Sequence, residues 1–179
     1  MTYGDILDAL RYESARLLMG NMDDEKVTKL IDELTRQGVY FDEFLDVLER
    51  PYYRPDFLKA LTASLARLGI EMPKNQDQAV WVLLTQSIFV MSSDKCDAAY
   101  AMSRLMADVY WNYDFSKLTK NYVGDSHGIE HLIGLYWDYD DLCCHYAPNS
   151  PPESDDKEYE AQLRDNARKW LAKYATQVP

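Results

Sequence analysis

Apolar residues recur three and four positions apart along most of the chain, the spacing that places them on one face of an α-helix. The first such stretch runs from Tyr3 to about Met19 and stops at Gly20. The second follows an N-cap at Asp23 and ends before Gly38, which suits the left-handed position after a helix. The pattern therefore predicts two consecutive helices at the start of the chain.

Six further helical stretches follow, each with start or stop signals of its own. Pro55 suits the first turn of a helix, and Asn75 with Gln78 three residues later is typical of a capped N-terminus. The helix that follows Asn75 is apolar on most sides, so we expect it to be the most buried one. The six expected ranges are about 42–49, 55–68, 75–91, 93–109, 128–146 and 155–175.

No stretch alternates β-branched and polar residues between turn signals, so no strand is expected. Eight helices with short links predict an all-α fold of stacked antiparallel pairs, arranged as a compact bundle or a HEAT-like array. The length of 179 residues suits a single helical domain over residues 1–179. Within it, the proline-rich segment 147–154 is expected to be a loop before the last helix.

Charge is distributed unevenly along the chain. Acids outnumber bases by 30 to 19, which gives a net charge of −11 and disfavours direct binding to nucleic acid. Between Lys120 and Lys157 the chain carries eight acids, all three histidines and no lysine or arginine. This segment therefore predicts a local acidic surface.

The cysteines and the start of the chain indicate a cellular location. Three cysteines cannot all pair, and the adjacent Cys143 and Cys144 rarely bridge each other, so we expect reduced thiols. The chain begins with MTYGDILDAL, which lacks the basic and apolar regions of a secretory signal. Its longest apolar stretch, 79–91, is shorter than the ~20 residues that span a membrane. Together these features predict a cytoplasmic protein without a membrane partner.

The helix expected at 128–146 has an acidic face. At about 100° per residue, Glu130, Asp138 and Asp141 project from one side of it together with Gly134. Asp140 falls instead on the apolar side, where a carboxylate needs a hydrogen-bond partner. Two interpretations stay open for Asp140: an internal hydrogen bond to a tyrosine or backbone group, or a place at a partner-binding surface.

Aromatic residues accompany these acids. Tyrosine and tryptophan serve in protein cores, but they are also the residues that anchor interfaces, because they bury a large area at low entropic cost. An acidic face that lacks lysine and arginine and lies next to aromatic side chains is suited to binding a basic protein. We therefore predict a partner-binding surface composed of Glu130, Trp137, Asp138, Tyr139, Asp140 and Asp141.

A second pattern points to different chemistry. His127, Glu130 and His131 match the H-x-x-E-H motif of inverzincin metalloproteases, in which two histidines one helical turn apart bind zinc and the glutamate acts as base. Residues 125–128 also resemble a helix start, which would place His127 outside the helix. A metal-dependent hydrolase is therefore the alternative prediction. The preferred prediction has no catalytic residue, metal or cofactor.

The tract at residues 122–142 has the sequence YVGDSHGIEHLIGLYWDYDDL. In a short, acidic, all-α chain it resembles the small cytoplasmic immunity proteins encoded beside bacterial polymorphic and contact-dependent growth-inhibition toxins. The resemblance implies a non-catalytic inhibitor whose acidic surface covers the basic active site of a cognate toxin domain, often a nuclease. We therefore expect such an inhibitor, with a regulatory helical scaffold subunit as a further alternative.

Overall fold

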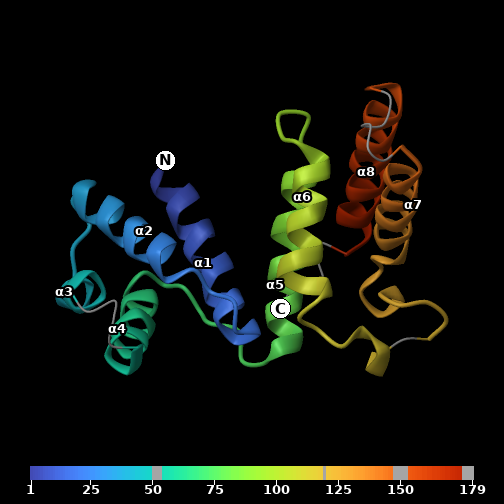
Figure 1. Ribbon diagram of the computed structural model, residues 1–179. Coiled ribbons are helices and arrows are strands. Elements are labelled where there is room, and N and C mark those ends of the chain that lie inside the picture. The colour runs from blue at the N-terminus through green and yellow to red at the C-terminus, as the bar shows by residue number, and fades with distance from the viewer. Residues whose placement is uncertain (50–53, 119, 147–152, 175–179) are drawn as a thin grey trace. The chain divides into compact units, whose positions relative to one another are not determined.

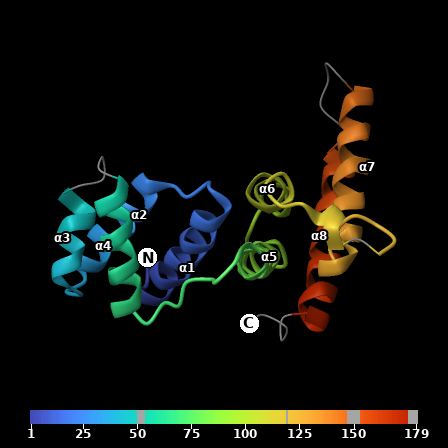
Figure 2. The ribbon, with the colours of Figure 1, turned by 90° about the horizontal axis from the view of Figure 1, so that it is seen from below.

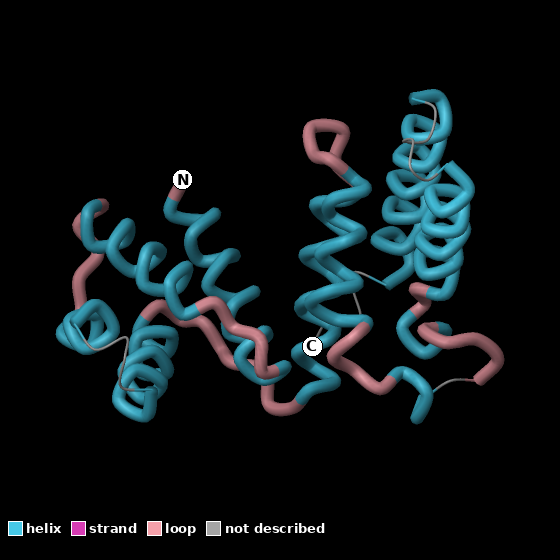
Figure 3. Tube along the Cα trace, in the orientation of Figure 1, coloured by secondary structure: helices cyan, strands magenta, loops and turns pink. Residues whose placement is uncertain are grey.

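The computed structural model describes residues 1–49, 54–118, 120–146 and 153–174 (Figures 1 and 3). All regular elements in these ranges are helices, eight of them α-helices, so the predicted all-α fold is confirmed. The chain divides into two compact units, Met1–Ala79 and Val80–Pro179. The single domain over residues 1–179 stays a prediction. No helix in the described ranges is both long and apolar enough to cross a membrane.

The first unit contains four helices, which begin and end close to where the sequence predicts. Asp23 caps α2 by accepting from the backbone of Lys26, and Gly20 and Gly38 have the positive φ angles expected after α1 and α2. Each helix packs against the next one, around a core that includes Ile31. The bounds are α1 Tyr3–Met19, α2 Asp24–Arg36, α3 Asp42–Glu49 and α4 Arg54–Arg67.

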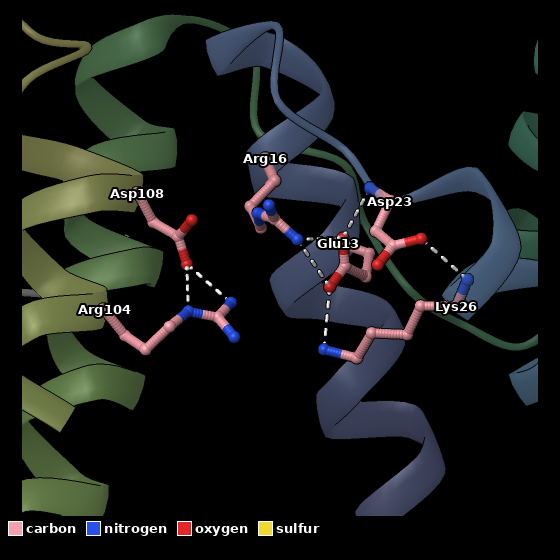
Figure 4. Close-up of polar contacts among 6 residues, drawn as sticks. All are labelled: Glu13, Arg16, Asp23, Lys26, Arg104 and Asp108. Atoms are coloured by element: carbon pink, nitrogen blue, oxygen red, sulfur yellow. Dashed lines mark hydrogen bonds and ion pairs between the residues drawn. The ribbon is translucent and has the colours of Figure 1, made fainter. Parts of the chain in front are cut away.

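A buried carboxylate ties α1 to the start of α2 (Figure 4). Both oxygens of Glu13 accept from Arg16, at 3.0 and 3.1 Å, and one accepts from the Nζ of Lys26 at 2.8 Å. The backbone N–H of Asp23 donates to Glu13 at 3.1 Å. Since Glu13 is fully buried, these donors replace the hydration that its charge loses on folding.

The second unit is built around the last four helices. Helix α8 contacts both α6 and α7, and both ribbon views show α7 and α8 side by side (Figures 1 and 2). The bounds are α5 Gln76–Met91, α6 Ala98–Leu105, η1 Met106–Tyr110, η2 Phe115–Leu118, η3 Asp125–His127, α7 Glu130–Tyr146 and α8 Glu153–Tyr174.

Helix α6 and its continuation differ from the expected helix at 93–109. The helix begins after an N-cap at Asp97, because residues 93–97 form a turn. It then continues as the π-helix η1, in which the buried Asp108 accepts from two nitrogens of Arg104, at 2.8 and 3.2 Å (Figure 4). The sequence predicted neither the later start nor the change of helix type.

One further expectation needs correction, and one stays a prediction. Helix α5 buries Leu83, Leu84 and Ile88 and exposes Phe89, and its place as the most buried helix stays a prediction. Of the predicted loop 147–154, residues 147–152 lie outside the described residues, and α8 already begins at Glu153.

Candidate protein-binding surface on helix α7

A tight turn determines where α7 begins. The carboxylate of Asp125 accepts from the backbone N–H groups of Lys120, Asn121 and Tyr122, at distances between 2.6 and 3.2 Å. These three hydrogen bonds stabilise the ionised form and lower the pKa of Asp125. The turn then passes into η3, so that α7 starts at Glu130 and not at 128 as expected.

Gly128 separates η3 from α7 and cannot be replaced without strain. Its φ of 69° lies in the left-handed region, and a Cβ at this position would lie 2.3 Å from the Cε2 of Tyr174. The ring of Tyr174 on α8 therefore packs directly against the backbone before α7. Contact with α8 thus helps to fix the direction in which α7 leaves the turn.

His127 lies in an aromatic environment beneath this turn. Only 1% of its surface is exposed, and its ring centroid lies 4.8 Å from Trp81, 5.3 Å from Phe115 and 5.7 Å from Tyr113. Ser126 contacts its Nδ1 at 2.9 Å. These contacts give His127 a place in the core of the second unit.

The H-x-x-E-H residues are not arranged as a pair of ligands. His127 belongs to η3 and is buried, whereas the side chain of His131 is on α7 and 81% exposed. The left-handed Gly128 stands between them, so the two histidines do not share a helical face as the motif requires. Within the described ranges, no three histidine, cysteine, aspartate or glutamate residues are placed to hold a metal ion.

The acidic residues of α7 lie at the surface. Asp138, Asp140 and Asp141 are all exposed, and so is Gly134 on the same helix. The carboxylate of Asp140 is therefore not in the core, and its place at a partner-binding surface stays a prediction. Glu130 at the start of α7 is less exposed, with 27% of its side chain accessible and its Oε1 4.0 Å from the Nε2 of His131.

Trp137 forms an exposed aromatic pair with Trp111. The two indoles meet edge to face, with centroids 5.8 Å apart and planes at 82°. Trp111 follows η1 and is 60% exposed, and Trp137 is 38% exposed. Tyr136 also packs against Trp137, with centroids 5.4 Å apart. Trp111 was not among the predicted surface residues, because no pattern in the sequence places it beside α7.

Tyr139 has a different environment from Trp137. Its ring stacks on Tyr159 of α8, with centroids 4.0 Å apart and planes at 4°, and its hydroxyl donates to Asp156. Both its ring and its hydroxyl are thus engaged in joining α7 to α8. Of the two aromatic anchors expected from the sequence, Trp137 is the more exposed.

We define the α7 surface by the exposed or half-exposed side chains Trp111, Glu130, Trp137, Asp138, Asp140 and Asp141. Comparison of the chain with protein-family models, curated proteins and solved structures gave no match. The function must therefore be inferred from the chemistry of the α7 surface.

Proposed function

We propose that the protein is a cytoplasmic inhibitor with the role of an immunity protein, which binds a basic toxin domain through the α7 surface. The observation that carries this proposal is the exposed pair of Trp111 and Trp137 beside the exposed carboxylates of α7. Large exposed indoles are unfavourable in water and are the residues most often found at interface hot spots. Burial of this pair against a partner would supply the apolar part of the interface.

The charges of the α7 surface indicate that the partner is a basic protein. Asp138, Asp140 and Asp141 are exposed within little more than one helical turn, and residues 121–156 contain no lysine or arginine. A negative field of this kind raises the association rate of a basic protein and disfavours acidic ones. A toxin whose active site binds phosphate groups has the required positive charge. Coverage of that site by α7 would block it sterically.

Inhibition by coverage needs no catalytic group on this chain. The hydrolase alternative would need His127 and His131 to ligate one metal ion, and their different locations give it no support. The scaffold-subunit alternative also places a protein on a surface of this chain. It differs from the proposal in the identity of the partner.

A titration of the purified protein with the C-terminal domain encoded by the adjacent reading frame tests the proposal. We expect Asp138→Lys and Asp141→Lys each to weaken binding by at least about 2 kcal/mol, because each change removes an attraction and adds a repulsion. Glu71→Lys makes a comparable charge change at an exposed residue of the first unit and should leave the affinity nearly unchanged. Full-strength binding by both α7 variants would exclude the α7 surface.

A further inference from the structure

Gly134 differs from the other glycines of the chain in its conformation and its position. All seven glycines lie within the described ranges, and five of them have a positive φ, which a residue with a Cβ adopts only with strain. A sixth, Gly4, lies in the first turn of α1. Gly134 is the fifth residue of α7 and is not among the glycines with a positive φ. It is therefore a glycine inside a helix, at a place where the backbone conformation does not require one.

The packing of the protein does not require a glycine at this position either. Gly134 is exposed, and a Cβ built on it meets nothing within 4 Å in the described part of the chain, apart from the local backbone of α7. Gly124 shows the contrast, since its Cβ would lie 2.7 Å from the Cδ1 of Ile133. A glycine inside a helix lowers stability relative to alanine, because its backbone loses more conformational freedom on folding. The described residues thus give no reason for the cost that the chain bears at Gly134.

The absence of a side chain leaves the backbone of α7 accessible at Gly134. Residues three and four positions away are the nearest neighbours on the surface of a helix, so their side chains border this place. His131 has 81% of its side chain exposed, Trp137 is 38% exposed, and Asp138 is exposed as well. We call this place the Gly134 site and define it by Gly134 with its bordering residues Glu130, His131, Trp137 and Asp138.

The Gly134 site lies on the part of α7 that the proposed function assigns to the partner. Asp138 and Asp141 follow Gly134 by four and seven positions, which is the spacing of one helical face, and both are exposed. Trp137, which pairs with Trp111, follows Gly134 by three positions. A basic partner that is attracted by the two carboxylates and covers Trp137 therefore also covers Gly134.

We infer that the main chain of the basic partner packs directly against the backbone of α7 at Gly134; the inference rests on the proposed function and names the point of closest approach in that interface. Two backbones approach each other most closely where a side chain is absent, and they then gain weak Cα–H···O contacts. An approach of this kind brings the partner's side chains within reach of Trp137 and of the carboxylates of Asp138 and Asp141. The stability lost at Gly134 is then offset by affinity for the partner.

Gly134→Ala tests this inference in the full-length protein, because its stability and its affinity should change in opposite directions. Alanine favours the helix, so we expect the thermal midpoint of the second unit to rise by about 2–4 °C. Tryptophan fluorescence measures this midpoint, since all four tryptophans lie in the second unit. Titration with the C-terminal domain encoded by the adjacent reading frame should show an affinity about tenfold lower, because the added methyl group overpacks the contact.

A second variant and a matched control complete the test. Gly134→Gln also favours the helix but adds a longer side chain, so we expect it to bind the toxin domain more weakly than Gly134→Ala does. Gly4→Ala adds the same methyl group to an exposed helical glycine of the first unit, where the Cβ would lie at an ordinary contact distance of 3.9 Å from the Oγ1 of Thr2. This control should bind the toxin domain like the unmodified protein.

The inference and the proposed function fail on different results. Unchanged affinity of Gly134→Ala, together with weakened binding by Asp138→Lys and Asp141→Lys, would overturn the close approach at Gly134 while leaving the α7 surface in place. A lower thermal midpoint of Gly134→Ala would also overturn it, because the chain itself would then need the space. Equal losses of affinity in Gly134→Ala and Gly4→Ala would have the same consequence. The proposed function fails separately if Asp138→Lys and Asp141→Lys bind the toxin domain at full strength.

Discussion

The indole Nε1–H of Trp170 donates to the backbone carbonyl oxygen of His127 at 2.8 Å, and both residues are buried. The bond joins α8 to η3 across 43 positions of the chain, and Trp81 of α5 packs against the rings of both residues, at 4.8 and 6.0 Å. Three elements therefore meet directly before α7. The position of the α7 surface consequently depends on the docking of α8.

This relationship predicts that Trp170→Phe destabilises the second unit. The smaller ring loses apolar contact, and the buried carbonyl of His127 loses its donor, so we expect a cost of about 2–4 kcal/mol in the free energy of unfolding. Urea denaturation followed by circular dichroism measures this cost. The exposed Trp111→Phe is the matched control and should change stability by less than about 0.5 kcal/mol. Equal stability of the two variants would show that the bond contributes nothing.

Gly128→Ala should also destabilise the protein, for two separable reasons. An alanine at a left-handed φ costs about 1–2 kcal/mol, and its Cβ would in addition collide with the ring of Tyr174. Gly20→Ala isolates the first cost, because Gly20 also has a positive φ but nothing lies within 4 Å of the place that its new methyl group would take. We expect Gly128→Ala to lower the thermal midpoint clearly more than Gly20→Ala. Equal midpoints would indicate that Tyr174 moves aside freely.

The contrast between these glycines shows how far the sequence predicts this fold. Gly20 and Gly38 act through local helix-stop chemistry, so the pattern places the ends of α1 and α2 correctly. The start of α7 depends on Tyr174, which is distant in the chain and whose contact with Gly128 no local pattern reveals. The acidic face of α7 could be predicted from spacing. The approach of Trp111 to Trp137 could not, because it is a tertiary contact between residues that are distant in the chain.

Glu13→Gln is expected to destabilise the first unit. The variant keeps the shape of the side chain but removes the charge that pairs with Arg16 and Lys26, at 3.0 and 2.8 Å. We expect a loss of about 2–4 kcal/mol in the free energy of unfolding, because the carboxylate is buried and its charge pairs with Arg16 and Lys26 are lost. Glu25→Gln, which breaks an exposed pair with Lys29, should cost less than about 0.5 kcal/mol in the same urea denaturation experiment. Similar losses would mean that burial does not strengthen the Glu13 pairs.

The turn before α7 should be sensitive to acid through Asp125. Its pKa is lowered from the ordinary 3.8, first by the backbone hydrogen bonds from Asn121 and Tyr122, so the folded state favours the ionised carboxylate. The resulting stabilisation is fully present above the unfolded-state pKa and is lost as the pH falls through the lower folded-state pKa. Asp125→Asn lacks this titration. The stability difference between the two proteins, measured by urea denaturation, should therefore shrink as the pH falls below about 4. A difference that stays constant down to that range would contradict the role of the carboxylate.

Trp137→Ala should separate binding from stability. With 38% of its surface exposed and an edge-to-face contact to Trp111, Trp137 contributes little to the core, so we expect the free energy of unfolding to fall by no more than about 1–2 kcal/mol. Binding to the toxin domain should weaken by about 2 kcal/mol or more, since truncation of a buried interface indole has costs of this size. Tyr100→Ala removes another exposed ring of the second unit, 62% exposed and outside the α7 surface, and should leave the affinity unchanged.

A double-mutant cycle tests whether the two indoles act together. Trp111→Ala should lose part of its effect on affinity when Trp137 is already alanine, because the two indoles support each other at the interface. Strictly additive effects on affinity would instead assign the two rings to independent contacts.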